Sequence, residues 1–207
     1  MKLITLTPNS FASNCYLVVH DAHAFVVDPS ASTERILSSL RAENAICDGI
    51  LLTHGHFDHM LSLDELRDAL PNVPTYIHEA DAENLSDGSK NAFSDFFGRQ
   101  RAWRAADRLL HEGDILSLSS ASLQVLHTPG HTKGSCCFLS SEGEFLLSGD
   151  TMFAAGYGRY DLYGGDPHAL AASLQRISTL PMTLTLASGH GETTTLERAW
   201  RALGHMI

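Results

Sequence analysis

Residues 53–60 read T-H-G-H-F-D-H-M. Four side chains that can bind a metal ion, His54, His56, Asp58 and His59, fall within six consecutive positions of this stretch. Histidines also occur on surfaces and in satisfied core positions. A cluster of three imidazoles and one carboxylate is rare by chance, however, so we interpret the stretch as part of a metal site.

The spacing within the cluster suits two metal ions. His54 and His56 are two positions apart, so along an extended chain both rings point to the same side and can reach one ion. Asp58 and His59 follow where the chain must turn into a helix, and their side chains therefore suit a second ion close by. The cluster comes directly after a predicted buried strand, residues 49–53, and sheet enzymes place their ligands beyond the carboxyl ends of strands.

Four ligands do not complete two metal sites, so other parts of the chain must contribute. Three candidates each follow a predicted strand and stand beside glycine: His131 in T-P-G-H-T-K-G, Asp150 in L-L-S-G-D-T and His190 in A-S-G-H-G-E. Any one of them alone would be interpreted as a loop residue, but their shared setting favours a joint role. The other histidines lack this setting and are interpreted as structural or surface residues: His20, His23, His78, His111, His127, His168 and His205.

Composition narrows the class of protein. The 207 residues are 43% hydrophobic and 18% charged, and no linker or repeat is visible, so we expect one globular domain over residues 1–207. A net charge of −10 without a basic patch argues against a nucleic-acid partner. The one gathering of basic residues, 99–104, is interpreted as a solvated helix face.

Nothing in the chain predicts a membrane segment or a disulfide framework. The first residues contain no apolar core of a signal peptide, and no apolar run approaches the roughly 18 residues that span a bilayer. The four cysteines show no C-x-x-C spacing and are expected to be buried thiols in a reducing compartment: Cys15, Cys47, Cys136 and Cys137. We therefore expect a cytoplasmic location and no membrane partner.

Hydrophobic patterning predicts strands and helices in alternating groups. The predicted strands are residues 2–7, 15–20, 23–28, 49–53, 74–78, 114–119, 122–128, 134–139, 144–148 and 184–187. The predicted helices are residues 32–41, 61–70, 103–110, 166–180 and 195–203. This alternation favours a layered α/β domain whose helices cover the outer faces of its sheets.

The candidate ligands, taken in order along the whole chain, resemble the ligand set of the metallo-β-lactamase superfamily. The resemblance implies a four-layered αβ/βα sandwich with a metal site along one edge of two facing sheets. It also implies that His54, His56 and His131 bind one ion. Asp58, His59 and His190 would then bind the other, and Asp150 would bridge the two together with a water or hydroxide.

Three motifs narrow the resemblance to hydroxyacylglutathione hydrolase (glyoxalase II) and its short bacterial homologues: T-P-G-H-T-K-G-S at 128–135, S-G-D-T-M-F at 148–153 and G-Y-G-R-Y-D at 156–161. This implies a small-molecule thioester substrate, cleaved by a metal-activated hydroxide, with Asp58 and Asp150 as the candidate catalytic residues. The favoured cofactors are two zinc ions, with iron or manganese as alternatives. The oligomeric state is left open.

The third motif has two interpretations. In the functional one, Arg159 or Tyr160 lines the mouth of the site and holds a carboxylate or amide of the substrate, because the planar guanidinium matches a carboxylate. In the other, residues 158–161 form a surface turn in which Arg159 pairs with Asp161.

Alternatives to a glutathione thioester also follow from the resemblance. The long glyoxalase II enzymes carry a C-terminal helical region that helps to hold glutathione, whereas this chain ends about 17 residues after His190, so a different thioester, a lactone or an ester is an alternative substrate. Persulfide dioxygenases are similar but use one iron, for which His54, His131 and Asp150 would form a facial triad. The complete second ligand set favours the hydrolase. A non-catalytic metal-binding module is the least favoured reading.

Overall fold

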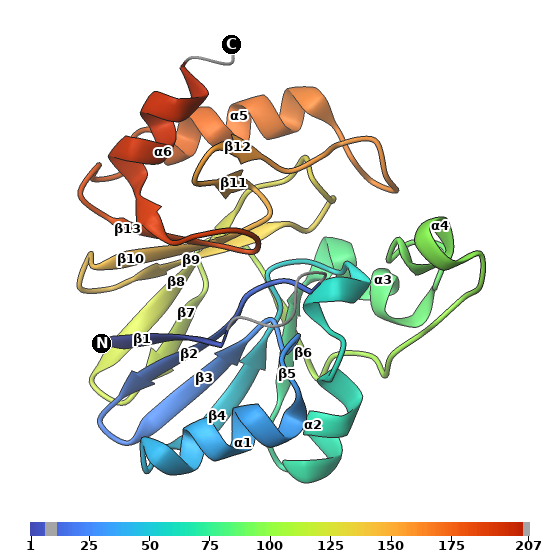
Figure 1. Cartoon of the computed structure of the whole chain (residues 1–207), viewed down its shortest axis with the longest axis vertical. Coiled ribbons are helices and arrows are strands. Elements are labelled where there is room, and N and C mark those ends of the chain that lie inside the picture. The colour runs from blue at the N-terminus through green and yellow to red at the C-terminus, as the bar shows by residue number, and fades with distance from the viewer. Residues whose placement is uncertain (7–11, 205–207) are drawn as a thin grey trace.

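Two six-stranded β-sheets pack face to face in the computed structural model, which describes residues 1–6 and 12–204 (Figure 1). The first sheet contains, in spatial order, β1 (Lys2–Leu6), β2 (Cys15–His20), β3 (His23–Val27), β4 (Ile46–Leu51), β5 (Thr75–His78) and β6 (Arg108–Leu110). The second contains β14 (Thr194–Thr195), β13 (Thr185–Ser188), β10 (Phe145–Gly149), β9 (Cys136–Ser140), β8 (Ala121–His127) and β7 (Ile115–Leu118). A separate hairpin pairs β11 (Met152–Phe153) with β12 (Gly156–Tyr157).

Helices cover both outer faces of this pair of sheets. In Figure 1, α1 (Thr33–Ala42) and α2 (Leu63–Ala69) lie below the first sheet, and α5 (Pro167–Ile177) and α6 (Leu196–Leu203) lie above the second. The first half also contains the 3₁₀ turns η1 (Phe57–His59) and η2 (Glu79–Asp81) and the short helices α3 (Ala82–Ser86) and α4 (Phe93–Phe97). The order helix, sheet, sheet, helix confirms the predicted four-layered αβ/βα sandwich. Within the described ranges, no helix combines the length and the apolar character that a membrane crossing requires.

Alternation along the strands gives each sheet two apolar faces. In β2, Leu17 belongs to the core between the first sheet and its helices, whereas Tyr16 and Val18 belong to the core between the sheets. In β9, Cys136 faces the first sheet and its neighbour Cys137 faces the layer of α5 and α6. All four cysteines are buried free thiols, as predicted.

Side-chain caps begin three helices at the predicted positions. Ser32, Asp166 and Thr195 each accept a hydrogen bond from a backbone N–H in the first turn of α1, α5 and α6, which satisfies a donor that the helix itself leaves unpaired. Pro167 occupies the first position of α5, where its missing N–H costs nothing. These local signals explain why the long helices could be predicted.

The helix predicted for residues 103–110 is wrong. The backbone N–H of Trp103 donates to the carbonyl of Leu85 at 2.7 Å, and Arg108–Leu110 form β6, which pairs in parallel with β5. Pairing at the sheet edge outweighs the helical spacing of the apolar residues, an ambiguity common in short apolar runs. Residues 99–104 likewise lie outside any helix. Two earlier assignments, Thr7 in a strand and His205 as structural or surface, lie outside the described residues.

An ion pair between Arg176 and Glu112 connects α5 to the loop before β7. Arg176 of α5 donates from Nη1 to Glu112 Oε2 at 2.9 Å, and this pairing is the main cause that lowers the pKa of Glu112. Both side chains are nearly half exposed, so Glu112→Gln should cost less than about 1 kcal/mol at pH 7. A folded pKa below the unfolded one contributes stability that is lost as the pH falls through the folded value. The melting temperatures of the wild-type and Glu112→Gln proteins should therefore differ at pH 7 and converge below pH 4.5. A difference that stays constant with pH would contradict a stabilising ion pair between Glu112 and Arg176.

Candidate metal centre

All seven predicted ligands meet at one edge of the sandwich. They are His54 and His56 after β4, Asp58 and His59 on η1, His131 between β8 and β9, Asp150 after β10, and His190 after β13. Their ligand atoms form three overlapping groups, and within each group the atoms lie within 4.8 Å of one another. The first group is His54, His56 and His131, and the second group is Asp58, His59 and His190. A third set, His54, His59 and Asp150, connects these two. The structure therefore brings together side chains that are up to 136 positions apart in the sequence.

The first group consists of three buried imidazoles. His131 Nε2 lies 2.9 Å from His56 Nδ1 and 3.2 Å from His54 Nε2. Burial lowers the pKa of His54 well below its ordinary value and lowers that of His56 to about 3, and the neighbouring rings add to both shifts. At neutral pH the rings of His54 and His56 are therefore neutral, which is the form that ligates a metal ion.

Hydrogen bonds on the outer side of the rings fix which nitrogens face inward. His131 Nδ1 donates to the carbonyl oxygen of Arg159 at 2.6 Å, and His59 Nδ1 donates to Asp28 Oδ2 at 2.9 Å. Because a carbonyl or carboxylate oxygen only accepts, each ring carries its proton on Nδ1. Nε2 of each ring therefore faces into the cluster, as hydrogen-bonding partners on the outer side of a ring arrange it in metal sites.

The second group contains a carboxylate and is more open. His190 Nε2 lies 3.1 Å from Asp58 Oδ2, and His59 Nε2 lies 3.9 Å from the same oxygen. His59 is fully buried, but the side chain of His190 is 37% exposed. This group therefore faces the side from which a substrate would arrive.

Asp150 lies between the two groups. Its Oδ2 is 3.6 Å from His131 Nε2 and 3.5 Å from His190 Nε2, and its Oδ1 is 3.2 Å from His59 Nε2. Burial acts to raise the pKa of Asp150, but the surrounding imidazoles, His59 first, outweigh it and hold that pKa well below the usual range. Gly189 leaves room for this carboxylate, because a Cβ there would come within 2.1 Å of Asp150 Oδ1.

The arrangement fits bound cations. His59 Nε2 and Asp150 Oδ1 are buried 3.2 Å apart, and neither atom has a partner with hydrogen-bond geometry among the described residues, which is costly unless another group satisfies them. Burial acts to lower the pKa of His59, yet the carboxylates around it, Asp150 and Asp28 foremost, raise that pKa well above its ordinary value. Two divalent ions would take the converging ring nitrogens as ligands, satisfy the unpaired carboxylate oxygen of Asp150 and balance the negative charge around His59.

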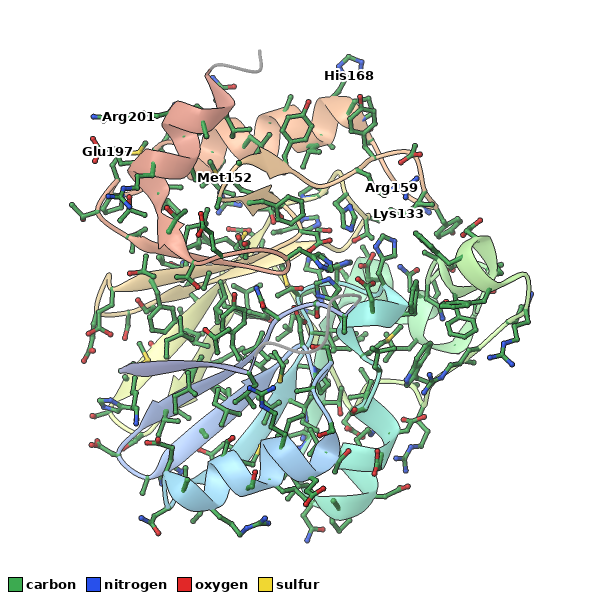
Figure 2. The ribbon with its side chains drawn as sticks, in the orientation of Figure 1. Lys133, Met152, Arg159, His168, Glu197 and Arg201 are labelled. Atoms are coloured by element: carbon green, nitrogen blue, oxygen red, sulfur yellow. The ribbon has the colours of Figure 1, made fainter. Side chains whose placement is uncertain are left out.

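A hollow of about 360 Å³ opens over the ligands. Apart from the predicted ligands and Arg159, the described residues that line it are apolar, with Phe96, Phe153 and Leu162 among them. Phe96 belongs to α4, and its ring centre lies 5.9 Å from the guanidinium carbon of Arg159 at the mouth of the hollow. In Figure 2, Arg159 lies on the loop that faces the segment carrying α4.

The structure combines both interpretations of residues 158–161. Arg159 lines the hollow, and its guanidinium also forms a two-pronged ion pair with Asp161, at 2.7 Å for each bond. Tyr160 does not reach the hollow over the ligands; it lines a separate one, about 300 Å³, together with Trp200 and Tyr157. Substrate contact by Tyr160 stays a prediction without support from the pocket geometry.

The remaining histidines that the structure describes lie outside the three ligand groups. His78 stacks on His127 at 4.0 Å between ring centres, a packing role. Two carboxylates that touch the ligand loops, Asp28 and Asp81, were not predicted from the sequence. Asp28 carried a usable signal, since V-V-D-P at 26–29 places an acid directly after a buried strand, as in the other ligand segments.

Comparison with known proteins places this geometry in a family context. The family model described as the metallo-beta-lactamase superfamily matches residues 9–190. The probable metallo-hydrolase YqgX of Bacillus subtilis is 32% identical over 195 residues, covering 94% of this chain and 92% of that protein. The hydroxyacylglutathione hydrolase GloC of Haemophilus influenzae is 29% identical over 210 residues, covering 98% of this chain and 96% of its own length.

Two solved structures are similar along nearly their whole length. The B3 metallo-beta-lactamase BLEG-1 superposes with a TM-score of 0.89 at 34% identity, covering 95% of each chain. A di-iron-bound form of TTHA1623 superposes with a TM-score of 0.82 at 35% identity, covering 98% of each chain.

Proposed function

The chain belongs to the metallo-β-lactamase superfamily of metal-dependent hydrolases, and we propose that it is a two-metal hydrolase whose substrate is a thioester, in the class of 2-hydroxyacyl thioesters of glutathione or of a smaller thiol. The observation that carries the proposal is the complete pair of ligand groups with Asp150 within 3.6 Å of both. A mononuclear oxygenase would need only His54, His131 and Asp150, and none of the second group. Zinc is the proposed metal, although the similar di-iron form of TTHA1623 keeps iron as the alternative.

The residues of the chain divide the work of hydrolysis. Two divalent ions, one at His54, His56 and His131 and one at Asp58, His59 and His190, would supply a water whose pKa is lowered from 15.7 toward ~7 and would polarise a carbonyl. The buried carboxylate of Asp150 would accept a hydrogen bond from that water and orient it. The apolar walls lower the polarity around the ligands, which strengthens charge interactions inside the hollow.

The hollow suits a thiolate leaving group better than an amine. A thiol with a pKa near 8.5 leaves as the thiolate without first gaining a proton, whereas an amine needs a proton donor. Among the described lining residues that are not predicted ligands, all are apolar except Arg159, whose guanidinium does not give up its proton. The lining therefore offers no general acid outside the ligand groups, which supports a thioester over an amide substrate.

The proposed function is tested by measuring free thiol released under nitrogen. Zinc-loaded protein should cleave S-lactoylglutathione or a neutral 2-hydroxyacyl thioester, and a chromogenic β-lactam should be cleaved far more slowly. If the β-lactam were cleaved faster than the thioesters, the proposed thioester substrate would be wrong. Oxygen uptake with glutathione persulfide, dependent on iron and without anaerobic thioester cleavage, would show a dioxygenase instead.

Arg159 is expected to hold an anionic group of the substrate. Its guanidinium is about half exposed at the mouth and already presents a two-pronged pairing geometry to Asp161, which a substrate carboxylate can take over. Arg159→Ala should raise KM for an anionic thioester about 10-fold, the loss of one charge-assisted hydrogen bond at a wet site. Metal content should not change.

A matched variant separates this effect from a general loss of positive charge. Arg201 on α6 forms a similar exposed pair with Glu197 at 2.6 Å, and Figure 2 places both on the opposite side of the molecule from Arg159. Arg201→Ala should leave KM unchanged. Equal KM values for the Arg159→Ala and wild-type proteins would assign residues 158–161 to a surface turn alone.

A further inference from the structure

One buried carboxylate lies outside the ligand set yet touches both loops that deliver the first ligand group. Asp81, the last residue of η2, is 1% exposed. Its Oδ2 accepts from the backbone N–H of Gly55 at 2.9 Å and from the hydroxyl of Thr132 at 2.6 Å. Its Oδ1 accepts from the backbone N–H of Gly134 at 2.7 Å.

These three donors stand beside the three imidazoles of the first group. Gly55 separates His54 from His56, and Thr132 directly follows His131. The first loop leaves the first sheet after β4, whereas the second joins β8 to β9 of the other sheet. Asp81 therefore ties together, through one carboxylate, two loops that belong to different sheets.

The chemistry of this contact requires a carboxylate. All three partners are donors, and an ionised carboxylate has only acceptor sites. An amide in the same place would keep one oxygen for Gly55 and Thr132 but would turn an N–H₂ group toward the N–H of Gly134. Two donors would then face each other in a buried place, where an unsatisfied polar group is expensive.

Close packing leaves these loops little room to shift. A Cβ on Gly134 would come within 2.6 Å of the backbone nitrogen of Asp81. A Cβ on Gly55 would come within 2.5 Å of Cβ of Asn84, on α3. Both glycines are thus explained by contact with the segment that carries Asp81, which holds the loops at a fixed separation.

We propose that Asp81 is the positioning residue of the His54, His56 and His131 group: it fixes the two loops so that the three ring nitrogens converge before a metal ion arrives. This inference rests on the proposed function in one respect, that the group binds a metal ion. Asp81 itself touches neither the hollow nor the reacting atoms.

The test compares metal affinity at the two ligand groups separately. In a His190→Ala background the second group is incomplete, so zinc affinity, measured by competition with a chromophoric chelator, reports on the first group. In a His56→Ala background it reports on the second. Asp81→Asn should weaken zinc binding ~10- to 100-fold in the first background, the range known for lost outer-shell partners. In the second background the affinity should change less than about 3-fold.

Milder and matched variants keep the test informative if Asp81→Asn folds poorly. Thr132→Val removes one donor and should weaken the first group in the same direction, whereas Thr132→Ser keeps the hydroxyl and should restore wild-type affinity. Ser140, which is 2% exposed and accepts from the N–H groups of Glu144 and Phe145, provides a control in a distant turn. Ser140→Ala should lower the melting temperature without changing either affinity.

The outcomes separate this proposal from the proposed function. A wild-type protein that binds no metal ion would overturn both. Two bound ions in the wild type, with an affinity of the first group that Asp81→Asn leaves unchanged, would overturn only the role of Asp81. Equal weakening of both groups would also overturn it, because the effect would then be general destabilisation. Visible spectra of cobalt-loaded protein provide a second measurement: in the His190→Ala background, Asp81→Asn should change the spectrum of cobalt bound to the first group, and an identical spectrum would contradict the role of Asp81.

Discussion

Asp150→Ala is expected to lower kcat for thioester hydrolysis about 10³-fold, within the range that a positioned acid–base group contributes. The reason is its place between the two ligand groups, 3.6 Å from His131 Nε2 and 3.5 Å from His190 Nε2. Its pKa is held well below the usual range, against burial, so the carboxylate stays ionised throughout the neutral pH range. Without it, the two groups would lose the carboxylate that lies between them, and an attacking water would lose its hydrogen-bond acceptor.

The measurement is kcat for a 2-hydroxyacyl thioester together with metal content. Asp64→Ala is a suitable control, because Asp64 is an exposed aspartate that pairs with Arg104 away from the hollow. That variant should keep wild-type kcat. An Asp150→Ala protein that retains activity within a factor of about three would exclude a role for this carboxylate in the chemistry.

Removal of metal ions is expected to abolish activity and to lower the melting temperature by about 5–10 °C for each site filled at 100 times its dissociation constant. Such binding adds about 2.7 kcal/mol to the folded state, and 1 kcal/mol corresponds to about 2–4 °C in a chain of this size. The structural cause is the cluster of buried polar atoms, among them His59 Nε2 and Asp150 Oδ1, which lack a hydrogen-bond partner in the part of the chain that the structure describes.

Thermal melts before and after treatment with a chelator, then after addition of zinc, check this expectation. A His131→Ala/Asp58→Ala double variant lacks a ligand at each group, so the chelator should change its melting temperature little. A wild-type protein whose melting temperature does not respond to chelator or zinc would contradict the assignment of the ligand groups.

The sequence was most informative where ligands follow strands. His54, His56, Asp58 and His59 could be placed because a buried strand, β4, ends directly before them and parallel strands end at a common edge. His131, Asp150 and His190 could be found in the same way, since each follows a strand and stands beside a glycine. The alternating strand and helix patterns predicted a layered domain with helices outside its sheets, and the family resemblance implied the four layers.

The features that were missed depend on contacts between distant residues. Asp81 is recognised only through Gly55, Thr132 and Gly134, which lie 26 to 53 positions away. The segment 103–110 was misassigned because its pairing partner, β5, lies far from it in sequence and gives no local signal. The side-chain direction of Tyr160 likewise depends on the fold around it, which turns it toward Trp200.

In the proposed mechanism, one water activated by two metal ions attacks the thioester, so both ions are needed for activity. This requirement is tested most directly by adding zinc in measured equivalents to metal-free protein under nitrogen while thiol release is recorded. We expect no release without metal and a maximal rate that is reached only as the second equivalent binds. Full activity at one equivalent, or in the presence of excess chelator, would contradict it.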